Sequence, residues 1–271
     1  MTLFTAFESL LVLLVLMTGV WVVSLLRRNV SVIDIFWSIG FLAVAWLNWL
    51  SVETHSIRQV VVMGCLHLWA LRLALYLLWR WWGAPEDKRY QAMRIRNGPR
   101  FAITSLVSVF WLQAALAAVI SLPVQMVLRA VEPFELGLLD AIGGVLFVVG
   151  FGFEAIGDAQ MVQFKADRSN QGKVCDRGLW RYTRHPNYFG EAVLWWGLWC
   201  FAAAIPTGGW TVVAPIVMTL LLLRVSGVSL LERQLVEEKL SYRQYMARTS
   251  AFIPWPPKSG SAAQNKAAHS F

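Results

Sequence analysis

The sequence predicts an all-α, polytopic membrane protein with seven transmembrane helices and a C-terminal interfacial helix. Its 271 residues are 57% hydrophobic and 15% charged, whereas a soluble domain of this size carries about 25% charged residues. The mean hydropathy is +0.53, and apolar runs of about 20 residues, long enough to cross a bilayer, recur along the chain. We therefore expect one membrane domain over residues 1–257 and a disordered tail over 258–271, which is rich in Ser, Ala, Lys and Gln.

Each predicted span is an apolar run that ends at polar or turn-forming residues. The seven runs cover approximately residues 3–26, 32–52, 57–82, 101–128, 136–161, 188–204 and 210–231. The first run contains Glu8 and has no basic segment before it, so we expect a retained helix and not a cleaved signal peptide. The fourth is expected to bend or end near Pro123. Apolar residues at 231, 235, 236 and 240 then share one face, which predicts an interfacial helix over about 232–247.

The distribution of basic residues predicts the orientation of the chain. Of the 24 Lys and Arg residues, twenty follow spans one, three, five or seven, and two, Arg58 and Arg129, lie on the opposite side. By the positive-inside rule, the N-terminus lies outside the inner (plasma) membrane, and the C-terminus and the large basic loops are cytoplasmic. The net charge of +8 follows from this bias, so it does not indicate a nucleic-acid partner.

Residue spacing argues against several kinds of site. The four histidines and three cysteines show no ligand spacing, so we expect no metal site. Gly150-x-Gly152 lacks the strand and helix context of a dinucleotide fingerprint, and we expect its small residues to let helices or a flat cofactor approach closely. We find no internal repeat, so the sequence does not support a transporter built from inverted repeats.

Segment 177–191 is the strongest functional candidate. Arg, His, Asn, Tyr and Glu side chains crowd there beside a very apolar helix. Placing so many polar side chains at a membrane surface costs free energy unless they bind a ligand. We therefore expect an anionic, hydrogen-bonding cytosolic cofactor, used on a lipid from the bilayer, and no obligate protein partner.

Ionisable side chains in the predicted spans are further candidates. Asp34 lies about one turn into the second span, either as an interfacial acid paired with a loop arginine or as a hydrogen-bond or proton donor. Glu154 and Asp158 share a helix face, either as members of structural ion pairs or as acceptors for a nucleotide cofactor. Arg72 and Arg224 are expected to pair with these acids or with phosphate.

Two segments outside the spans each have a structural and a functional interpretation. The basic loop 83–100 either contacts lipid phosphates as a topology determinant or binds cofactor phosphates through Arg89, Arg94 or Arg96. The tail helix either only lies on the membrane, or closes the cofactor site over segment 177–191. The tail residues that would close the site are Glu237, Tyr242 and Tyr245.

These motifs resemble a known membrane superfamily. Arg184-His-Pro-Asn-Tyr-Phe-Gly-Glu191, followed by Glu237-Glu238-x-Leu240-x-x-Tyr-x-x-Tyr245 and Ile253-Pro254, is similar to a C-terminal signature. Steroid 5-alpha-reductases, sterol C14 and C7 reductases and isoprenylcysteine carboxyl methyltransferases share that signature. The Glu86-Asp-x-Arg-Tyr90 loop and the Gly157-Asp158…Lys165 stretch resemble the bacterial DUF1295 family beside the steroid 5-alpha-reductases. The signature region is residues 136–257, and the N-terminal half resembles the superfamily mainly in span layout.

The resemblance implies seven helices and NADPH bound by the cytoplasmic half. It implies cofactor roles for Asp158, Lys165, Asn187 and Glu191, and matches Arg72 and Arg224 to arginines of the third and seventh spans. Together with the candidates above, the expected cofactor-binding residues are Arg72, Glu154, Asp158, Lys165, Arg181, Arg184, His185, Asn187, Tyr188, Glu191, Arg224, Glu237, Tyr242 and Tyr245.

The resemblance also implies a catalytic acid. In steroid reductases a glutamate that opens the second span polarises the substrate ketone, and the nearest match here is Asp34, one methylene shorter. The partner tyrosine of the third span has no clear counterpart, because Trp69 falls there, so Tyr76 and Tyr90 are the available phenols. The expected activity is NADPH-dependent reduction of a conjugated C=C bond in a steroid-like or other lipid substrate.

Two other functions remain open. The first is an S-adenosylmethionine-dependent methyltransferase acting on a lipid or prenylcysteine carboxylate, with Arg184 and Tyr188 orienting the cofactor. It fits the Arg-His-Pro motif but leaves Asp34, Arg72 and Asp158 without a role. The second is a non-enzymatic lipid-binding or scaffold protein, which leaves the polar segment 177–191 unexplained.

Overall fold

The computed structural model describes residues 3–130, 135–225, 228, 232 and 240–258. Over these residues the secondary structure is helical, apart from an isolated bridge between Thr183 and Ser250. The predicted all-α class is therefore confirmed. The chain divides into two compact units, Met1–Asp140 with Trp199–Ala214, and Ala141–Leu198 with Pro215–Phe271.

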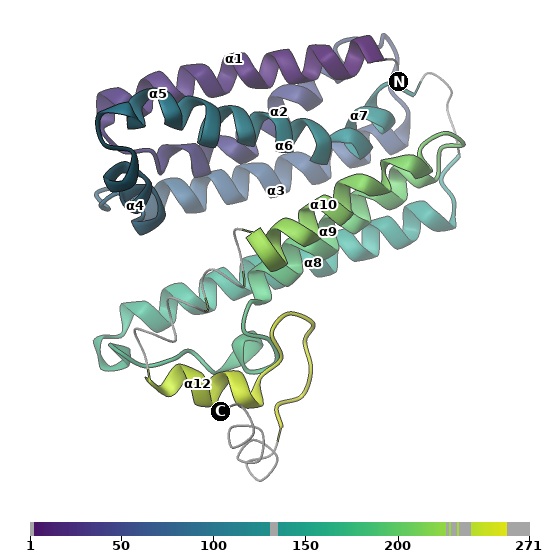
Figure 1. Ribbon diagram of the computed structural model, residues 1–271. Helices are drawn as coiled ribbons and strands as arrows, with labels where there is room; N and C mark the ends of the chain where they lie inside the picture. Colours follow the sequence, from purple (N-terminus) through teal and green to yellow (C-terminus); the bar gives the residue numbers. More distant parts are fainter. Residues whose placement is uncertain (1–2, 131–134, 226–227, 229–231, 233–239, 259–271) are drawn as a thin grey trace. The chain divides into compact units, whose positions relative to one another are not determined.

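The first unit is built around three long helices that follow one another in alternating directions (Figure 1). These are α1 (Leu3–Arg27), α2 (Val32–Trp49) and α3 (Ile57–Trp81). The chain continues through α4 (Lys88–Asn97), η1 (Gly98–Arg100), α5 (Phe101–Ser105), the π-helical η2 (Leu106–Trp111), α6 (Leu112–Ile120) and α7 (Leu122–Leu128). Helix α2 contacts α1 and α3, while α6 packs on α1 and α2. Apolar side chains such as Met17, Phe41, Trp69 and Phe110 fill the core of this unit.

The second unit is built around the parts of α8 (Leu138–Ala166) and α9 (Pro186–Ala203) that follow Asp140 and precede Trp199. The loop between them contains two short turns, η3 (Arg168–Asn170) and η4 (Gly178–Arg181). After α9 come η5 (Gly209–Val212), α10 (Val213–Leu220), the π-helical η6 (Leu221–Val225) and α12 (Leu240–Arg248). Part of the predicted interfacial helix, 232–247, lies outside the described residues, as does all but the first residue of the predicted tail.

Glycines bring the backbones of α8 and α9 into contact. A Cβ added at Gly150 would lie 2.5 Å from both the Gly190 carbonyl oxygen and the Leu194 amide nitrogen, and one at Gly197 would lie 2.7 Å from the Gly143 oxygen. The glycines recur every seven residues on each helix, so they fall on one face. The expected close helix approach is confirmed at Gly150, and it fixes how the polar residues nearby face each other.

Five helical stretches of the described chain are long and apolar enough to cross a membrane. They are Thr5–Arg27, Val32–Trp49, Ile57–Trp81, Lys88–Ile120 and Leu138–Ala166. A shorter apolar stretch covers Gly209–Arg224, and α9 opens with the polar sequence Pro186-Asn-Tyr-Phe-Gly-Glu191. A membrane protein is therefore supported. The count of seven spans remains a prediction.

The structure changes one sequence-based boundary and confirms another. Residues 88–97, predicted as loop, form helix α4, because the Asp87 side chain caps the Arg89 amide and Gly98, with φ of 52°, ends the helix. The predicted break near Pro123 is confirmed, since α6 ends at Ile120 and Pro123 lies in the first turn of α7. A proline is tolerated there because the first-turn amides have no partner within the helix.

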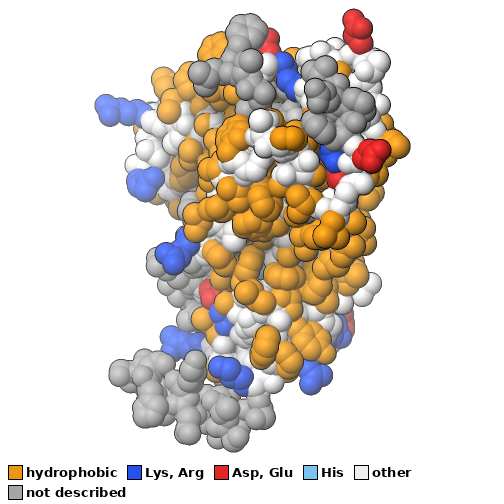
Figure 2. Space-filling model, turned by 90° about the vertical axis from the view of Figure 1, so that its right-hand side faces the viewer, with side chains coloured by type: hydrophobic (Ala, Val, Ile, Leu, Met, Phe, Trp, Pro, Cys, Tyr) orange, Lys and Arg blue, Asp and Glu red, His pale blue; other side chains and the backbone are white. Residues whose placement is uncertain are grey.

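Apolar side chains cover much of the surface. Leu26, Val15 and Leu75 are among many large hydrophobic residues with more than half of their area exposed. Figure 2 shows one face on which hydrophobic side chains predominate. Exposed apolar area of this extent is typical of a surface that meets lipid.

Candidate functional site

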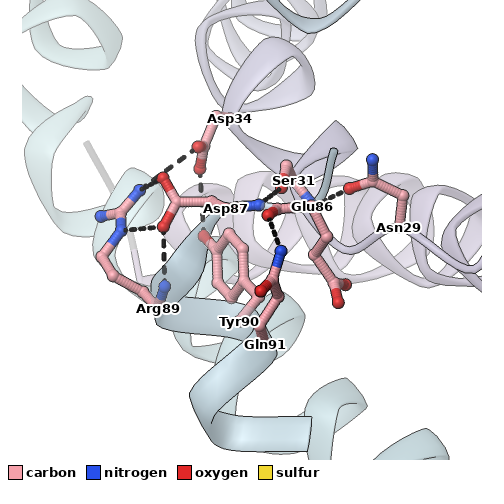
Figure 3. A network of polar contacts seen from close by, with 8 residues as sticks. All are labelled: Asn29, Ser31, Asp34, Glu86, Asp87, Arg89, Tyr90 and Gln91. Atoms are coloured by element: carbon pink, nitrogen blue, oxygen red, sulfur yellow. Dashed lines mark hydrogen bonds and ion pairs between the residues drawn. The ribbon is translucent and has the colours of Figure 1, made fainter. Parts of the chain in front are cut away.

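In the first unit, a phenol and a carboxylate meet at the start of α2. The Tyr90 hydroxyl of α4 donates to Oδ1 of Asp34 over 3.0 Å (Figure 3). Tyr90 is buried, while the Asp34 side chain keeps about a third of its area exposed, at 35%. The pair therefore combines a held O–H group with a carboxylate that a ligand can reach.

The loop before α4 is bonded to the turn between α1 and α2. Oε1 of Glu86 accepts from the Val30 amide over 2.8 Å, and the Asp87 amide donates to Oγ of Ser31 over 2.8 Å. Burial acts to raise the pKa of Glu86, but the hydrogen bonds from Arg94 and the Val30 amide outweigh it and hold the pKa below its usual range. These contacts fix the register at which Tyr90 meets Asp34.

Two of the three arginines proposed to bind phosphate are used inside this network. Nε of Arg89 lies 2.9 Å from Oδ1 of Asp87, and its Nη2 lies 3.5 Å from Oδ2 of Asp34. Arg94 pairs with Glu86 over 2.8 Å. Arg96 is exposed, so a phosphate would reach it without first breaking these ion pairs.

The phenol that meets Asp34 is Tyr90, and Tyr76 has other neighbours. The guanidinium groups of Arg72 and Arg80 lie 6.0 and 5.6 Å from the centre of the Tyr76 ring, which also stacks with Trp79. Trp69, at the place of the missing tyrosine, is fully buried and packs edge-on against Phe41 at 5.5 Å. The structure therefore brings together one of the two candidate phenols and the candidate acid.

In the second unit, polar residues of α8 and α9 gather where the helices pack closely. Nδ2 of Asn187 donates to Oδ1 of Asp158 over 3.3 Å. Glu154, Asp158 and Glu191 are all buried, with at most 9% of each residue exposed. Four of the residues predicted to bind the cofactor thus lie on the facing parts of two adjacent helices.

Arg184 is held by a carboxylate that sequence reasoning missed. Its Nε and Nη2 donate to the two oxygens of Glu232 over 2.7 and 3.1 Å, and its Nη1 donates to the carbonyls of Met246 and Thr249 over 2.9 Å each. Burial acts to raise the pKa of Glu232, but the hydrogen bonds from His185 and Arg184 hold it below its usual range. Glu232 directly follows the seventh predicted span, in a stretch where the signature drew attention to Glu237 instead.

His185 shares the same carboxylate. Its Nε2 lies 3.1 Å from Oε1 of Glu232, and since a carboxylate only accepts, Nε2 carries the proton. The His185 ring stacks on Tyr188, with centres 5.5 Å apart and an angle of 5° between the planes. His185 is 1% exposed, so it is part of the interior of this unit.

The C-terminal residues bond to segment 177–191, and the closure of a cofactor site there stays a prediction. The Tyr245 hydroxyl donates to the Trp180 carbonyl, the Arg184 amide donates to the Ser250 carbonyl over 2.9 Å, and the Trp255 amide donates to the Tyr182 carbonyl over 2.9 Å. Burial raises the pKa of Tyr245 well above its usual value. Tyr242 is also buried, and burial together with the Glu232 charge raises its pKa.

The other predicted cofactor residues lie at the surface or outside the described chain. Lys165, Arg181 and Arg224 are exposed, and Glu237 falls outside the described residues. Within the described part, no three His, Cys, Asp or Glu side chains are grouped to hold a metal ion.

A family model described as "Protein of unknown function (DUF1295)" matches residues 20–249. The chain belongs to the DUF1295 family. An uncharacterized protein of Schizosaccharomyces pombe is 25% identical over 275 residues, covering 91% of this chain and 78% of the yeast protein. No solved structure matches the chain significantly.

The DUF1295 match covers both polar clusters. Asp34 and Tyr90 in the first unit, and the stretch from Glu154 to Tyr245 in the second, all lie between residues 20 and 249. The residues of the tail that bond to Tyr182 and Thr183, from Ser250 on, lie just beyond the matched region.

Proposed function

We propose that this DUF1295 protein is a membrane-embedded, NADPH-dependent reductase of a conjugated C=C bond in a steroid-like or other lipid substrate. The observation that supports it best is the Tyr90–Asp34 pair, a hydrogen-bonded phenol and carboxylate at the end of a candidate span. A reductase of an enone needs such a group at the carbonyl oxygen, and the other candidate functions give it no role.

The reaction needs charge stabilisation more than a nucleophile. When bound, NADPH supplies the hydride, which adds to the β-carbon of the enone, and the electron pair of the C=C bond moves to form an enolate. A hydrogen-bond donor held at the carbonyl oxygen lowers the energy of that enolate. We assign the Tyr90 O–H as this donor. Its single proton bonds to Asp34 in the structure, so the phenol turns it to the substrate when the ketone binds. A protonated Asp34 would then donate to the phenol oxygen and hold it in that position. A proton from water then adds to the α-carbon of the enolate and completes the reduction.

The polar face of α8 and α9 has the chemistry that a nucleotide cofactor needs. Besides the N–H that Asn187 donates to Asp158, its amide has a second N–H donor and an acceptor oxygen. Carboxylates such as those of Asp158 and Glu191 suit the ribose hydroxyls or the carboxamide of the cofactor. Exposed Lys165 and Arg181 suit phosphate groups. We propose these residues as the cofactor site, together with Glu154, Arg184, His185 and Tyr188.

A methyltransferase using S-adenosylmethionine is the second candidate. One observation favours it: Arg184, His185 and Tyr188, the residues of the shared motif, form one compact cluster around Glu232. A binding experiment with both cofactors separates the two functions.

The test is a thermal unfolding midpoint of the detergent-purified protein with NADPH and, separately, with S-adenosylmethionine. A ligand that binds only the folded state adds about 2.7 kcal/mol at a hundredfold excess over Kd, so we expect a higher midpoint with NADPH alone. Asn187→Ala and Glu191→Ala should abolish that rise. Stabilisation by S-adenosylmethionine alone would overturn the reductase in favour of the methyltransferase.

With NADPH binding in hand, reduction of lipid enones tests the catalytic pair. Tyr90→Phe should lower kcat by about a hundredfold, as loss of one oxyanion donor does, and leave the NADPH-induced shift unchanged. Tyr76→Phe is the matched control and should change kcat little.

A further inference from the structure

The helix α4 has two chemically different faces. Its inner face carries Arg89, Tyr90 and Arg94, which are engaged with Asp34, Asp87 and Glu86. Its outer face carries Lys88, Ile95 and Arg96, all exposed. Lys88 and Ile95, seven residues apart, lie on one side of the helix, and Arg96 lies at the edge of that side, next to Arg89. Arg100, just after the helix, is also exposed.

The acidic groups at this end of the first unit are already bonded to arginines. Segments 27–34 and 76–104 contain three acids, Asp34, Glu86 and Asp87. Asp34 and Asp87 pair with Arg89, and Glu86 pairs with Arg94. The outer face of α4 therefore presents positive charge to its surroundings.

Apolar side chains project beside these cations. Ile95 is 84% exposed on a helix made mostly of polar residues. Trp79 and Trp82, at the end of the candidate span α3, are 61% and 77% exposed. The ends of α1 and α3 and the helix α4 lie together at one end of the bundle (Figure 1). Exposed tryptophan at the end of a span is typical of the interface between lipid and water.

We propose that this basic rim, defined as Lys88, Ile95, Arg96 and Arg100 with Trp79 and Trp82, docks on anionic phospholipid headgroups of the adjacent leaflet. The cations meet headgroup phosphates, while Ile95 and the two indoles enter the boundary of the acyl chains. All of these side chains are exposed, which suits a lipid surface. A soluble nucleotide needs a concave site instead. The inference does not depend on the proposed reductase activity.

Native mass spectrometry of the full chain in neutral detergent tests the proposal, with phosphatidylglycerol and phosphatidylcholine titrated separately. We expect the wild type to prefer phosphatidylglycerol, and this preference to fall with salt. Replacing Lys88, Arg96 and Arg100 together by Gln should weaken phosphatidylglycerol binding by about tenfold or more, and leave phosphatidylcholine binding and the thermal midpoint unchanged.

A control with the same charge change replaces Arg168, Lys173 and Arg243, exposed residues of the second unit, by Gln. It should keep the wild-type preference for phosphatidylglycerol. Ile95→Ser retains every charge and should weaken phosphatidylglycerol binding at all salt concentrations. This single variant therefore tests the proposal even if the triple variant fails to fold. Equal losses in both triple variants, no preference in the wild type, or displacement of the lipid by NADPH would each overturn the proposal.

Discussion

At the scale of single residues, Glu232 organises the polar part of the second unit. It neutralises Arg184 with two parallel hydrogen bonds and accepts a third from His185. Its side chain is 12% exposed and that of Arg184 is 9% exposed. Removing one member of such a pair leaves the other charge buried without compensation, which costs far more than the pair itself contributes.

Glu232→Gln should therefore lower the free energy of unfolding by about 3 kcal/mol at neutral pH. The matched control is Asp176→Asn, because Asp176 also pairs with an arginine, Arg248, but both side chains are nearly half exposed. Exposed pairs contribute about 0–1 kcal/mol. Denaturant unfolding in detergent measures both, and equal effects would contradict the prediction.

The pKa of Glu232 gives this difference a pH dependence. Since the folded-state pKa lies below the value in the unfolded chain, the stabilisation is complete above an unfolded pKa of about 4.3 and is lost as pH falls through the folded pKa. The difference in the free energy of unfolding between the wild type and Glu232→Gln should then stay constant from neutral pH down to about 5. It should become smaller in more acidic solution.

The sequence indicated some of these residues and not others, for a physical reason. Asp34 stands out because an acid inside an apolar run is costly. The choice of Tyr90 over Tyr76 depends on Asp87, whose cap starts α4 and whose amide bonds Ser31. Glu232 is one acid among several in a charged stretch, and only tertiary contact with Arg184 distinguishes it.

At the scale of helices, the glycines of α8 divide into two groups with opposite roles. Gly150 touches the α9 backbone, whereas an added Cβ at Gly144 or Gly152 would meet nothing within 4 Å. Where there is no contact, glycine costs about 1 kcal/mol relative to alanine in a helix interior. At Gly150, a methyl group would force the two helices apart.

Gly150→Ala should thus destabilise the protein by about 1–3 kcal/mol, the usual cost of overpacking. Gly144→Ala, on the same helix, should stabilise it by up to about 1 kcal/mol. Thermal midpoints of the two variants should move in opposite directions. A shift of the same sign in both would show that α8 and α9 are not packed as described.

Hydropathy predicted the long helices well but not the polar or irregular ones. The bounds of α1 and α3 agree with the predicted runs 3–26 and 57–82 within one residue at each end, because burial in lipid demands continuous apolar sequence. Helix α4 has no apolar periodicity and owes its start to the Asp87 cap. The π-helical turns η2 and η6 cannot be told from α-helix by the hydropathy of an apolar run.

At the scale of the whole molecule, the number of spans remains the main structural question. Five stretches are long and apolar enough, and α9 and Gly209–Arg224 would make seven if both cross. Both counts are odd, so either places the two termini on opposite sides. The basic residues do not decide between them, because none lies between Arg184 and Arg224.

The location of the turn between α9 and the stretch Gly209–Arg224 distinguishes five spans from seven. Thr207, in this turn, is exposed. If both helices cross, Thr207 lies on the opposite side of the membrane from loop 167–178. If neither helix crosses, Thr207 and loop 167–178 lie on the same side. In a chain with its three cysteines replaced, Thr207→Cys should react with an impermeant maleimide in right-side-out vesicles, and Ser169→Cys should react only after permeabilisation. Protection of both would reduce the count to five and leave α9, with Asn187 and Glu191, at the membrane surface. These two proposed cofactor residues would then lie on a helix that does not enter the bilayer, and a lipid enone would have to leave the membrane to reach them.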